Sequence, residues 1–549
     1  MQIINIKDLK KYYGQRLLLD IDEIKINSGD KIGVVGVNGV GKTTLLEVIA
    51  GSIDFDSGDI YVNPKASLKY IAQLGEAENK IISGKYASIF NVPNQWRQSM
   101  SGGEKTRFKL AEGFENQGSL ILIDEPTSNL DIGGIDLIIN NFKEYGDTYL
   151  VVSHDRNLLD SVCNTILEIE NGKVKLYKGN YSKYAELKNE EVNRQEFEYE
   201  EYVKEKKRLN NLKSNIVDKS SSIKSPPKRM GNSEARLHKM GGQGSKKKLD
   251  SVAKSIESRI EHLEVKEKPK EQDLIKIKIM DSTKPHGKIL VSGESINKSY
   301  GENVIFDNAK FNIFNGKKVA LIGPNGSGKT TLINMIMNEE DIKLSKNVRI
   351  GYFSQSLDIL DKNRTILDNV MDRSIHDENF ARLILARLLF KGNKVYDKVE
   401  FLSGGERVKV SFAKMILDDI NILILDEPTN YLDIGSLDVI EKLLVNYNGT
   451  ILLVSHDRRF IENVANDLLI IEENKIKHFQ GNYKEYLDRK DNPNLDIREK
   501  EIEEKMDLLK TEISALIGEI SLEKNKKRKM ELDLRYQKKL RELKSLESS

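Results

Sequence analysis

The chain has 549 residues, which is long enough for two or more domains with sizeable cores. Charged residues make up 31% of it, but the signs nearly cancel to a net charge of +2, and the single cysteine, Cys163, excludes a disulfide framework and suits a reducing compartment. No apolar run approaches the roughly 20 residues of a membrane-spanning helix, and residues 1–5 lack the apolar core of a signal peptide. We therefore expect a soluble, cytoplasmic protein.

An internal repeat organises the chain. The tyrosine of a Tyr-Gly pair at 13 recurs at 300, and the glycine-rich GVNGVGKT at 36–43 recurs as GPNGSGKT at 323–330, both with an offset of 287. Four later motifs recur with an offset of 302: SGGE at 101 and 403, DEPT at 124 and 426, SHDR at 153 and 455, and GNY at 179 and 481. The second half thus carries 15 extra residues between its glycine-rich loop and SGGE. We expect repeats at 1–186 and 288–487, a linker at 187–287 and a tail at 488–549.

Each glycine-rich loop follows a strand-like run and precedes a helix-like one, which is the context of a phosphate-binding loop. The backbone N–H groups of such a loop surround phosphates, its lysine reaches the β- and γ-phosphates, and the next threonine can ligate Mg²⁺. The expected ATP-binding residues in these loops are Gly36, Asn38, Gly39, Gly41, Lys42, Thr43 and Thr44, and Gly323, Asn325, Gly326, Gly328, Lys329, Thr330 and Thr331.

Two apolar, strand-like runs end in an acidic pair, Asp124-Glu125 and Asp426-Glu427. A buried parallel strand delivers such acids to the carboxyl edge of a sheet. We expect Asp124 and Asp426 to hold Mg²⁺ through water, and Glu125 and Glu427 to orient or deprotonate the attacking water. A lone Asp-Glu pair is usually a solvated turn, but a preceding strand and a following Pro-Thr favour catalysis.

This set of motifs, with a glutamine after a strand in each half (Gln73 and Gln355), resembles ATP-binding-cassette ATPases over both repeats. The resemblance implies an α/β fold with two P-loop ABC ATPase domains in tandem. It implies that Ser101, Gly102 and Gly103 complete the second ATP site, and that Ser403, Gly404 and Gly405 complete the first. It also implies that His154 and His456 contact the γ-phosphate, that Tyr13 and Tyr300 stack on adenine, and that Gln73 and Gln355 serve Mg²⁺. Both cassettes carry every catalytic element, so we expect two composite sites and leave unequal rates open.

Cassettes that carry SHDR and then GNY followed by Tyr184 or Tyr486 resemble the ABC-F subfamily, whose members act on ribosomes. The first helical subdomain, where housekeeping members carry an extra arm, is the shortened one here. The linker segment PKRMGNSEARLHKM at 227–240 resembles Vga-type antibiotic-resistance factors, which protect ribosomes from lincosamides, pleuromutilins and group A streptogramins. The resemblance implies large-subunit rRNA of a bacterial ribosome and P-site tRNA as partners, no membrane, and a monomer whose two cassettes pair.

The linker itself reads as an antiparallel helical hairpin. A helix-favouring run at 192–216 and an apolar stripe at 252–263 flank three expected breakers, at Ser220–Ser222, Pro226–Pro227 and Gly241–Gly244. A helix of about 28 residues would reach roughly 40 Å. Residues 203–254 carry 15 Lys/Arg against four Asp/Glu, so the irregular tip, at about 217–250, suits RNA; a solvated charged coiled coil is the alternative. The expected contacts combine cations with apolar or flat groups: Lys228, Arg229, Met230, Arg236, Leu237, His238, Lys239 and Met240.

The tail has apolar residues at alternating spacings of four and three, which is a coiled-coil seam: Ile502, Met506, Leu509, Ile513, Leu516 and Ile520. A second helix from about Met530 to Leu546 can fold back on it, giving a C-terminal helical extension. Contact of its basic turn with rRNA and plain structural packing remain equal alternatives.

The leading hypothesis is a ribosome-bound ATPase that gives antibiotic resistance, with the linker tip displacing drug and ATP hydrolysis releasing the factor. A housekeeping ABC-F translation factor is the alternative within the same class. The alternative of another class is the ATPase subunit of a membrane exporter, for which the basic linker has no role.

Overall fold

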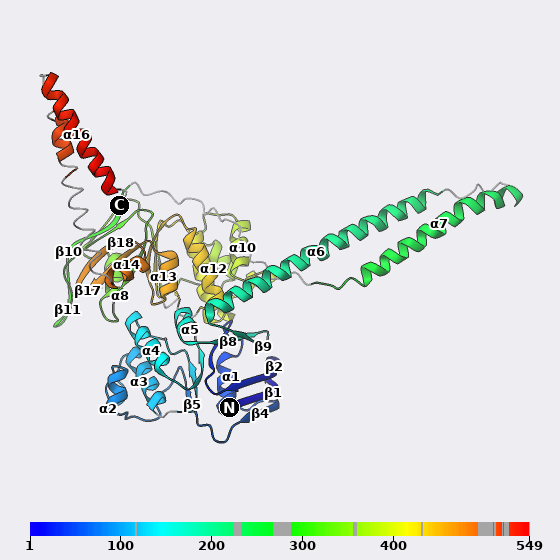
Figure 1. Ribbon diagram of the computed structural model, residues 1–549, viewed down its shortest axis with the longest axis horizontal. Helices are drawn as coiled ribbons and strands as arrows, with labels where there is room; N and C mark the ends of the chain where they lie inside the picture. Colours follow the sequence, from blue (N-terminus) through cyan, green and yellow to red (C-terminus); the bar gives the residue numbers. More distant parts are fainter. Residues whose placement is uncertain are drawn as a thin grey trace. The chain divides into compact units, whose positions relative to one another are not determined.

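The computed structural model describes residues 1–115, 118–223, 232–266, 287–354, 359–429, 432–491, 509, 512–518, 520 and 526–547. The chain divides into two compact units, shown with the course of the chain in Figure 1. Unit 1 comprises residues 1–129, 134–277 and 433–435, and unit 2 comprises 130–133, 278–432 and 436–549. Each unit is built around one six-stranded and one three-stranded sheet.

In unit 1 the larger sheet is parallel except for its last pair, β8 and β9, which are antiparallel. Its central strands are buried on both faces, which is why their sequences read as continuous apolar runs. In spatial order the strands are β5 (Leu68–Ile71), β6 (Leu120–Asp124), β7 (Thr148–Val152), β3 (Lys31–Gly36), β8 (Thr165–Glu170) and β9 (Lys173–Lys178).

The smaller sheet of unit 1 is antiparallel, in the order β2 (Arg16–Asn27), β1 (Gln2–Tyr13), β4 (Ser57–Val62). Its inward side chains, such as Ile4 and Ile24, share one core with Leu122 of β6 and Leu45 of helix α1 (Lys42–Ile49). This core fixes the strand β3, the helix α1 and the loop between them, where the phosphate-binding motif lies.

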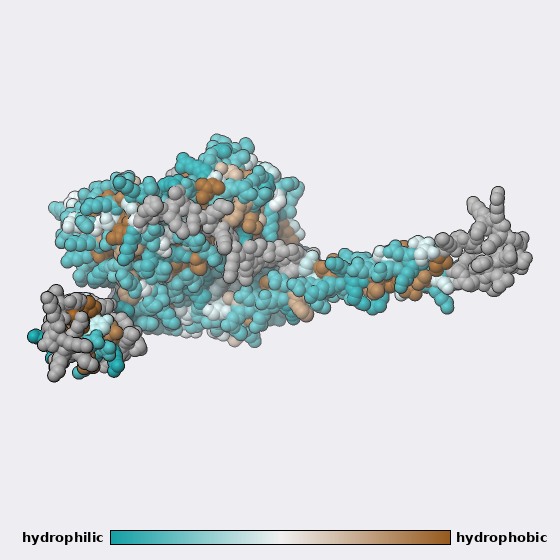
Figure 2. All heavy atoms as spheres, turned by 90° about the horizontal axis from the view of Figure 1, so that it is seen from above, coloured by the Kyte–Doolittle hydropathy of each residue, from teal (hydrophilic) through white to brown (hydrophobic). Residues whose placement is uncertain are grey.

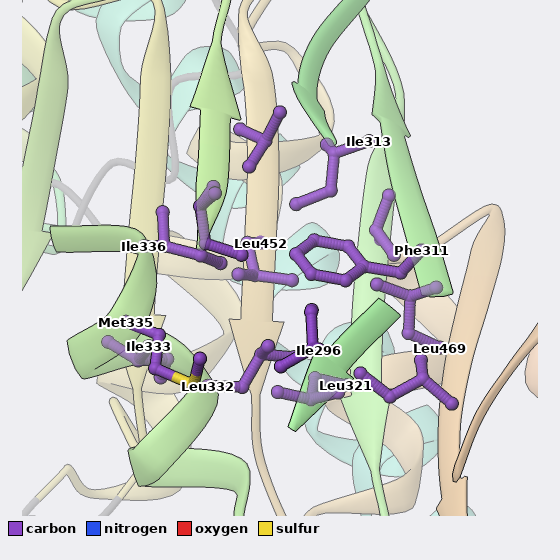
Figure 3. Packing of buried hydrophobic residues seen from close by; sticks show 14 of the residues in the cluster. Ile296, Phe311, Ile313, Leu321, Leu332, Ile333, Met335, Ile336, Leu452 and Leu469 are labelled. Carbon is purple, nitrogen blue, oxygen red and sulfur yellow. The ribbon is translucent and has the colours of Figure 1, made fainter. Parts of the chain in front are cut away.

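Unit 2 repeats this plan. Its larger sheet runs β14 (Ile350–Phe353), β15 (Ile422–Asp426), β16 (Thr450–Val454), β12 (Lys318–Ile322), β17 (Asp467–Glu472), β18 (Lys475–Gln480), and its smaller sheet β11 (Asn303–Phe314), β10 (Ile289–Tyr300), β13 (Ile342–Leu344). Figure 3 shows Phe311 of the smaller sheet facing Leu452 and Leu469 of the larger one, with Ile336 of helix α8 (Lys329–Met337) beside them. The prediction of two tandem α/β cassettes is confirmed.

The remaining helices surround the sheets. In order they are α2 (Gly84–Ile89), α3 (Gly102–Glu115), α4 (Ile132–Glu144) and α5 (Arg156–Val162), then α9 (Ile366–Met371), α10 (Glu378–Arg387), α11 (Gly404–Leu417), α12 (Ile434–Val445), α13 (Arg458–Val464) and α14 (Tyr483–Asp491). Two short 3₁₀ helices, at Gly392–Tyr396 and Val399–Phe401, precede α11. The ten-residue α10 and the 3₁₀ turns occupy the stretch in which the second repeat is longer by 15 residues.

The linker forms two long helices, α6 (Tyr181–Ser222) and α7 (Asn232–Glu261), which lie side by side (Figure 1). Leu209 and Ile256 are buried between them, and Lys213 Nζ pairs with Glu257 Oε1 at 2.6 Å. The outer surface of the pair is mostly hydrophilic, with scattered apolar side chains (Figure 2). The hairpin prediction is confirmed for the described residues.

The expected breakers are partly wrong. Helix α6 runs through Ser220–Ser222, so it spans 42 residues, or about 63 Å. The hydroxyls of Ser221 and Ser222 donate back to the carbonyls of Asp218 and Lys219, which lets serine stay helical. Helix α7 likewise runs through Gly241–Gly244, because a cost of roughly 1 kcal/mol per glycine does not end a 30-residue helix. Pro226 and Pro227 lie outside the described residues.

In the tail, helix α16 (Lys526–Glu547) matches the predicted second helix, and Lys539 Nζ lies 2.8 Å from Glu512 Oε2 of the preceding helical segment. Leu509, Ile513 and Leu532 are buried, as a folded-back hairpin requires. Ile502 and Met506 of the predicted seam lie outside the described residues. Within the part of the chain that the structure describes, no helix is both long and apolar enough to cross a membrane.

Candidate functional site

The first phosphate-binding loop connects β3 to α1 and holds a buried lysine. Lys42 Nζ donates to Gly36 O at 2.8 Å, to Val37 O at 3.4 Å and to Asn38 Oδ1 at 3.3 Å. Burial lowers the pKa of Lys42, while the Glu125 carboxylate opposes that shift. The ammonium is therefore held by the loop itself, with its charge available to an anion cradled there.

Helices α1 and α8 both begin at a glycine in the left-handed region, Gly41 with φ 107° and Gly328 with φ 104°. A Cβ on Gly328 would lie 2.4 Å from Ile305 Cγ2 and 3.0 Å from Phe306 Cζ. Glycine at these two positions adopts the left-handed backbone conformation that starts the helix, and at Gly328 no side chain would fit. The N-terminus of each helix therefore points at its phosphate-binding loop.

Strand β6 ends at the first acidic pair, next to α1. Thr43 Oγ1 donates to Asp124 Oδ2 at 2.8 Å, which brings the two expected Mg²⁺ ligands together. Glu125 follows in a positive-φ conformation (φ 49°), and its N–H donates to Val152 O of β7 at 2.9 Å. Such a conformation is uncommon for a residue with a side chain and clusters at functional sites. Burial raises the pKa of Glu125 to about 8, although Lys42 opposes the shift.

A histidine faces this glutamate. His154 Nε2 lies 3.4 Å from Glu125 Oε1, and the His154 backbone N–H donates to Glu125 Oε2 at 3.4 Å. Burial, with the charge of Lys42, lowers the pKa of His154 to about 3, so the ring is neutral near pH 7. A neutral imidazole in the Nε2–H form can donate to the carboxylate or to a phosphate oxygen.

The second site repeats this geometry. Lys329 Nζ donates to Gly323 O at 2.9 Å and Pro324 O at 3.0 Å. Glu427 has φ 48°, donates its N–H to Val454 O at 2.9 Å, and places Oε1 3.2 Å from His456 Nε2. Burial raises the pKa of Glu427 to about 7 and lowers that of His456 to about 4. The repeat therefore extends from the sequence motifs to a strained, buried Glu–His pair in each cassette.

Sequence reasoning missed a tyrosine beside each acidic pair. Tyr352 of β14 donates its hydroxyl to Asp426 Oδ2 at 3.4 Å. Tyr70 of β5 precedes Gln73 by three residues, as Tyr352 precedes Gln355. Burial and the Asp124 charge raise the pKa of Tyr70, so this hydroxyl also stays protonated. The recurrence of Tyr three residues before the glutamine in both halves is a sequence signal for this pair of residues.

The two SGGE motifs cap helices α3 and α11. The backbone N–H of Ser101 donates to Glu104 Oε2 at 2.8 Å, and that of Ser403 donates to Glu406 Oε2 at 3.0 Å. The backbone N–H groups of Glu104 and Glu406 donate in return to the serine hydroxyls. Gly102 and Gly103, and Gly404 and Gly405, form the first turns of the two helices. These reciprocal bonds are capping boxes, which leave the helix ends rigid and their first N–H groups accessible. Completion of each site by the other cassette's motif stays a prediction.

Within unit 2, the backbone N–H of Asn325 in the phosphate-binding loop donates to Asp131 Oδ2 at 2.9 Å. Asp131 is part of the 130–133 segment, which follows DEPT in the first repeat and belongs to this unit. Asp131, which comes from the first repeat, thus accepts a hydrogen bond from the phosphate-binding loop of unit 2.

The remaining predicted ATP-binding residues lie in the phosphate-binding loops, in the helices that follow them, or at the ends of β1 and β10. Thr44 and Thr331 lie in the first turns of α1 and α8, and Gly39 and Gly326 adopt positive φ in the loops. Tyr13 and Tyr300 end strands β1 and β10 and are 53% and 59% exposed, as a ring that is free to stack must be. Thr330 opens α8 beside Lys329.

Gln73 follows β5, and its carbonyl accepts from Lys109 Nζ at 2.7 Å. Lys109 lies on α3, is 9% exposed, and also donates to Ala72 O at 2.8 Å, so it joins the SGGE helix to the glutamine segment. Gln355 lies outside the described residues, as do Lys228, Arg229 and Met230 of the linker tip. Arg236, Leu237, His238, Lys239 and Met240 fall within α7 rather than on an irregular tip.

The residues of both sites fit Mg²⁺ and ATP. Each site joins a phosphate-binding loop, a buried lysine bonded to that loop, and a buried aspartate; in the first, the aspartate accepts from the threonine hydroxyl. No cluster of three His, Cys, Asp or Glu that could cage a metal occurs among the described residues. Mg²⁺ is typically held by one or two protein oxygens together with substrate phosphates, and Thr43 with Asp124 would supply such oxygens in the first site. When bound, Mg²⁺ would neutralise phosphate charge; the acceptance of a proton by Glu125 and Glu427 stays a prediction.

Comparison with known proteins agrees with this geometry. The ABC transporter family model matches residues 19–97 and 306–430. The chain is 36% identical to the erythromycin resistance ATP-binding protein MsrA of Staphylococcus epidermidis, over 81% of this chain and 93% of that protein. It is 32% identical to the ribosome protection protein VmlR of Bacillus subtilis, over 82% of this chain and 83% of that protein.

Solved structures give the same fold. An archaeal ribosome recycling factor, solved with a ribosomal stalk protein, superposes with a TM-score of 0.56 at 20% identity, covering 86% of this chain and 90% of that one. At this identity the likeness concerns the fold alone. The motifs, their geometry and the two relatives above 30% identity together place the chain in one family: it belongs to the ABC-F type of ATP-binding-cassette proteins and is an ATPase with two ABC domains in tandem.

Proposed function

We propose that this protein binds the bacterial ribosome in its ATP-bound form and protects it from antibiotics of the peptidyl-transferase centre. The drug classes that we propose are lincosamides, pleuromutilins and group A streptogramins. Large-subunit rRNA and P-site tRNA are the partners, the α6–α7 hairpin displaces the drug, and ATP hydrolysis releases the factor.

The observation that carries this proposal is the likeness, over both cassettes and more than four-fifths of the chain, to proteins whose names are ribosome protection protein and erythromycin resistance ATP-binding protein. The hairpin supports it, because a 42-residue helix provides the length to act far from its own ATP site, and its residues 203–254 carry an excess of cations.

The chemistry of the sites supports a hydrolysis-timed cycle. A glutamine in place of Glu125 and Glu427 keeps the phosphate-binding loops and lysines but cannot accept a proton, so the protein should bind ATP and remain closed. We therefore expect the Glu125→Gln/Glu427→Gln protein to sediment with ribosomes in ATP, and the Lys42→Ala/Lys329→Ala protein not to do so.

Protection is tested in a ribosome-dependent translation assay. Each drug is titrated with and without the wild-type protein, using a lincosamide, a pleuromutilin, a group A streptogramin and erythromycin. Recovery of translation with the first three supports the proposal. Recovery with erythromycin alone would contradict the proposed drug classes while keeping ribosome protection, and no recovery with any drug would favour a housekeeping translation factor.

The role of the hairpin end is tested by replacing residues 228–240 with a short Gly-Ser turn. We expect ATP hydrolysis to persist and protection to be lost. Persistence of protection in this variant would mean that the linker only spaces the two cassettes.

A further inference from the structure

A buried carboxylate lies where the hairpin leaves the first cassette. Glu168 of β8 is 8% exposed, and its side chain accepts three hydrogen bonds. The donors are Tyr184 Oη at 2.7 Å, Lys188 Nζ at 2.9 Å and Tyr177 Oη at 3.1 Å. Tyr184 and Lys188 belong to the first turns of α6, whereas Tyr177 belongs to β9, so one carboxylate ties the helix to two strands of the sheet.

Further bonds surround this group. Lys188 Nζ also donates to Glu170 Oε2 at 2.8 Å, and Tyr177 Oη lies 3.1 Å from Glu191 Oε2, so its single proton is shared between Glu168 and Glu191. Ser182, at the start of α6, bonds both oxygens of Asp160 on α5 at 2.6 Å. Burial raises the pKa of the Tyr184 hydroxyl, and the Glu168 charge raises it further, so Tyr184 remains a hydrogen-bond donor.

The carboxylate lies on the strand next to the one that leads into the phosphate-binding loop of its own cassette. Glu168 pairs across the sheet with Val35, the residue before Gly36 of the phosphate-binding loop. Because β3 and β8 are hydrogen-bonded neighbours in one sheet, a shift of the loop strand moves the residue that holds α6. Over the roughly 63 Å of α6, a change of about 5° at its base moves its far end by about 5 Å.

The second cassette lacks a carboxylate at the position of Glu168, although Tyr486 of α14 donates its hydroxyl to Glu472 Oε1 at 3.4 Å. At the offset of 302 established by the motifs, Ile470 replaces Glu168 and Phe479 replaces Tyr177. Ile470 pairs with Ile322 as Glu168 pairs with Val35, and it is buried. An apolar pair therefore suffices to fill this position and to pack the sheet, so stability of the fold does not require the carboxylate.

We infer that Glu168, with Tyr177, Tyr184 and Lys188, is a positioning joint that fixes the direction of the α6–α7 hairpin relative to the phosphate-binding strand of the first cassette. Hydrogen bonds to a buried carboxylate fix direction because they are short, charge-assisted and costly to leave unmade, whereas an apolar contact can slide. The part of this inference that concerns drug protection rests on the proposed function; the rigidity of the joint does not.

The test replaces the joint with the residues of the second cassette, Glu168→Ile with Tyr177→Phe. Spin labels are placed on exposed positions of unit 1, Asp22→Cys in β2 and Asn215→Cys on α6, in a Cys163→Ala background. Asn215 lies about 51 Å along α6 from the start of the helix. If the double variant lets α6 swing by about 5° more about its base, the distribution of distances between the two labels should broaden by roughly 4 Å. Tyr486→Phe, the matching change at the base of α14, should leave the distribution unchanged.

Basal ATP hydrolysis should remain at the wild-type rate, because no residue of the joint touches the ATP site, while drug protection per bound ribosome should fall. If the double variant has the same distance distribution as the wild type, the inference that these residues fix the direction of the hairpin is contradicted, even if the wild-type protein protects ribosomes. A broadened distribution together with a wild-type protein that gives no protection would support the joint and contradict the proposed function. If the double variant does not fold, Tyr184→Phe, which keeps the ring and removes one donor, decides between the same outcomes.

Discussion

The buried glutamates of the two acidic pairs predict a specific dependence of stability on pH. Glu427 is 9% exposed, and burial raises its pKa to about 7 from the ordinary 4.5. A carboxyl group whose pKa is raised in the folded state binds more protons when folded than when unfolded between pH 4.5 and 7. The free energy of unfolding therefore falls as pH rises through this window.

The magnitude follows from the shift. A difference of about 2.5 pKa units corresponds to about 3 kcal/mol, which the folded protein loses fully only above pH 7. Glu427→Gln removes the ionisation and keeps the shape of the side chain. We expect the variant to exceed the wild type in unfolding free energy by less than about 1 kcal/mol at pH 5 and by about 3 kcal/mol at pH 8.

The assay is urea unfolding at pH 5 and pH 8, without nucleotide and with a chelator present. Protection of amide hydrogens in β15 and β16 separates the second cassette from the first. Glu462→Gln, an exposed acid on α13 of the same unit, is the control and should give no such difference. A Glu427→Gln advantage that is equal at both pH values, or that shrinks as pH rises, would refute the assignment of this glutamate as a buried carboxyl with a raised pKa.

Four further predictions concern the same sites. Glu125→Gln with Glu427→Gln should lower phosphate release by at least about 100-fold while binding of a fluorescent ATP analogue persists; hydrolysis near the wild-type rate would contradict the catalytic assignment. Thr43→Ala, which removes the hydroxyl bonded to Asp124, should raise the Mg²⁺ concentration for half-maximal hydrolysis by roughly tenfold, and Thr43→Ser should restore it. Lys109→Met should slow hydrolysis at the first site because the Gln73 segment loses its bond to α3, as site-resolved nucleotide crosslinking would record. Gly328→Ala, which meets Ile305 at 2.4 Å, should destabilise unit 2 by about 3 kcal/mol, against about 1 kcal/mol for Gly326→Ala, which meets nothing within 4 Å.

Much of the site was predictable because its chemistry is local. The phosphate-binding loops lie within eight consecutive residues and carry their glycines, lysine and threonine in fixed order, so their conformation hardly depends on the rest of the chain. The same holds for Asp124-Glu125, whose place at the end of a buried strand follows from the apolar run before it.

Helix lengths were less predictable. The three serines at 220–222 and the glycines at 241–244 indicated helix ends, yet both helices continue. Low helix propensity does not end these helices, because each such residue costs the helix at most about 1 kcal/mol. The opposite helix adds packing and hydrogen bonds, as when Asp250 accepts from the Ser220 hydroxyl at 2.6 Å.

Spacing and periodicity over a few turns predicted the tandem cassettes and the helical hairpin, which the structure confirms. The identity of the ATP-binding residues follows from the same spacing and stays a prediction. The tertiary structure alone decided which distant groups meet. Thr43 and Asp124 are 81 residues apart, Glu125 and His154 are 29 apart, and Glu168 receives donors from both β9 and α6. No local pattern specifies such encounters, since they are set by the order of strands in the sheet and by the low tolerance of a buried carboxylate for an unmade hydrogen bond.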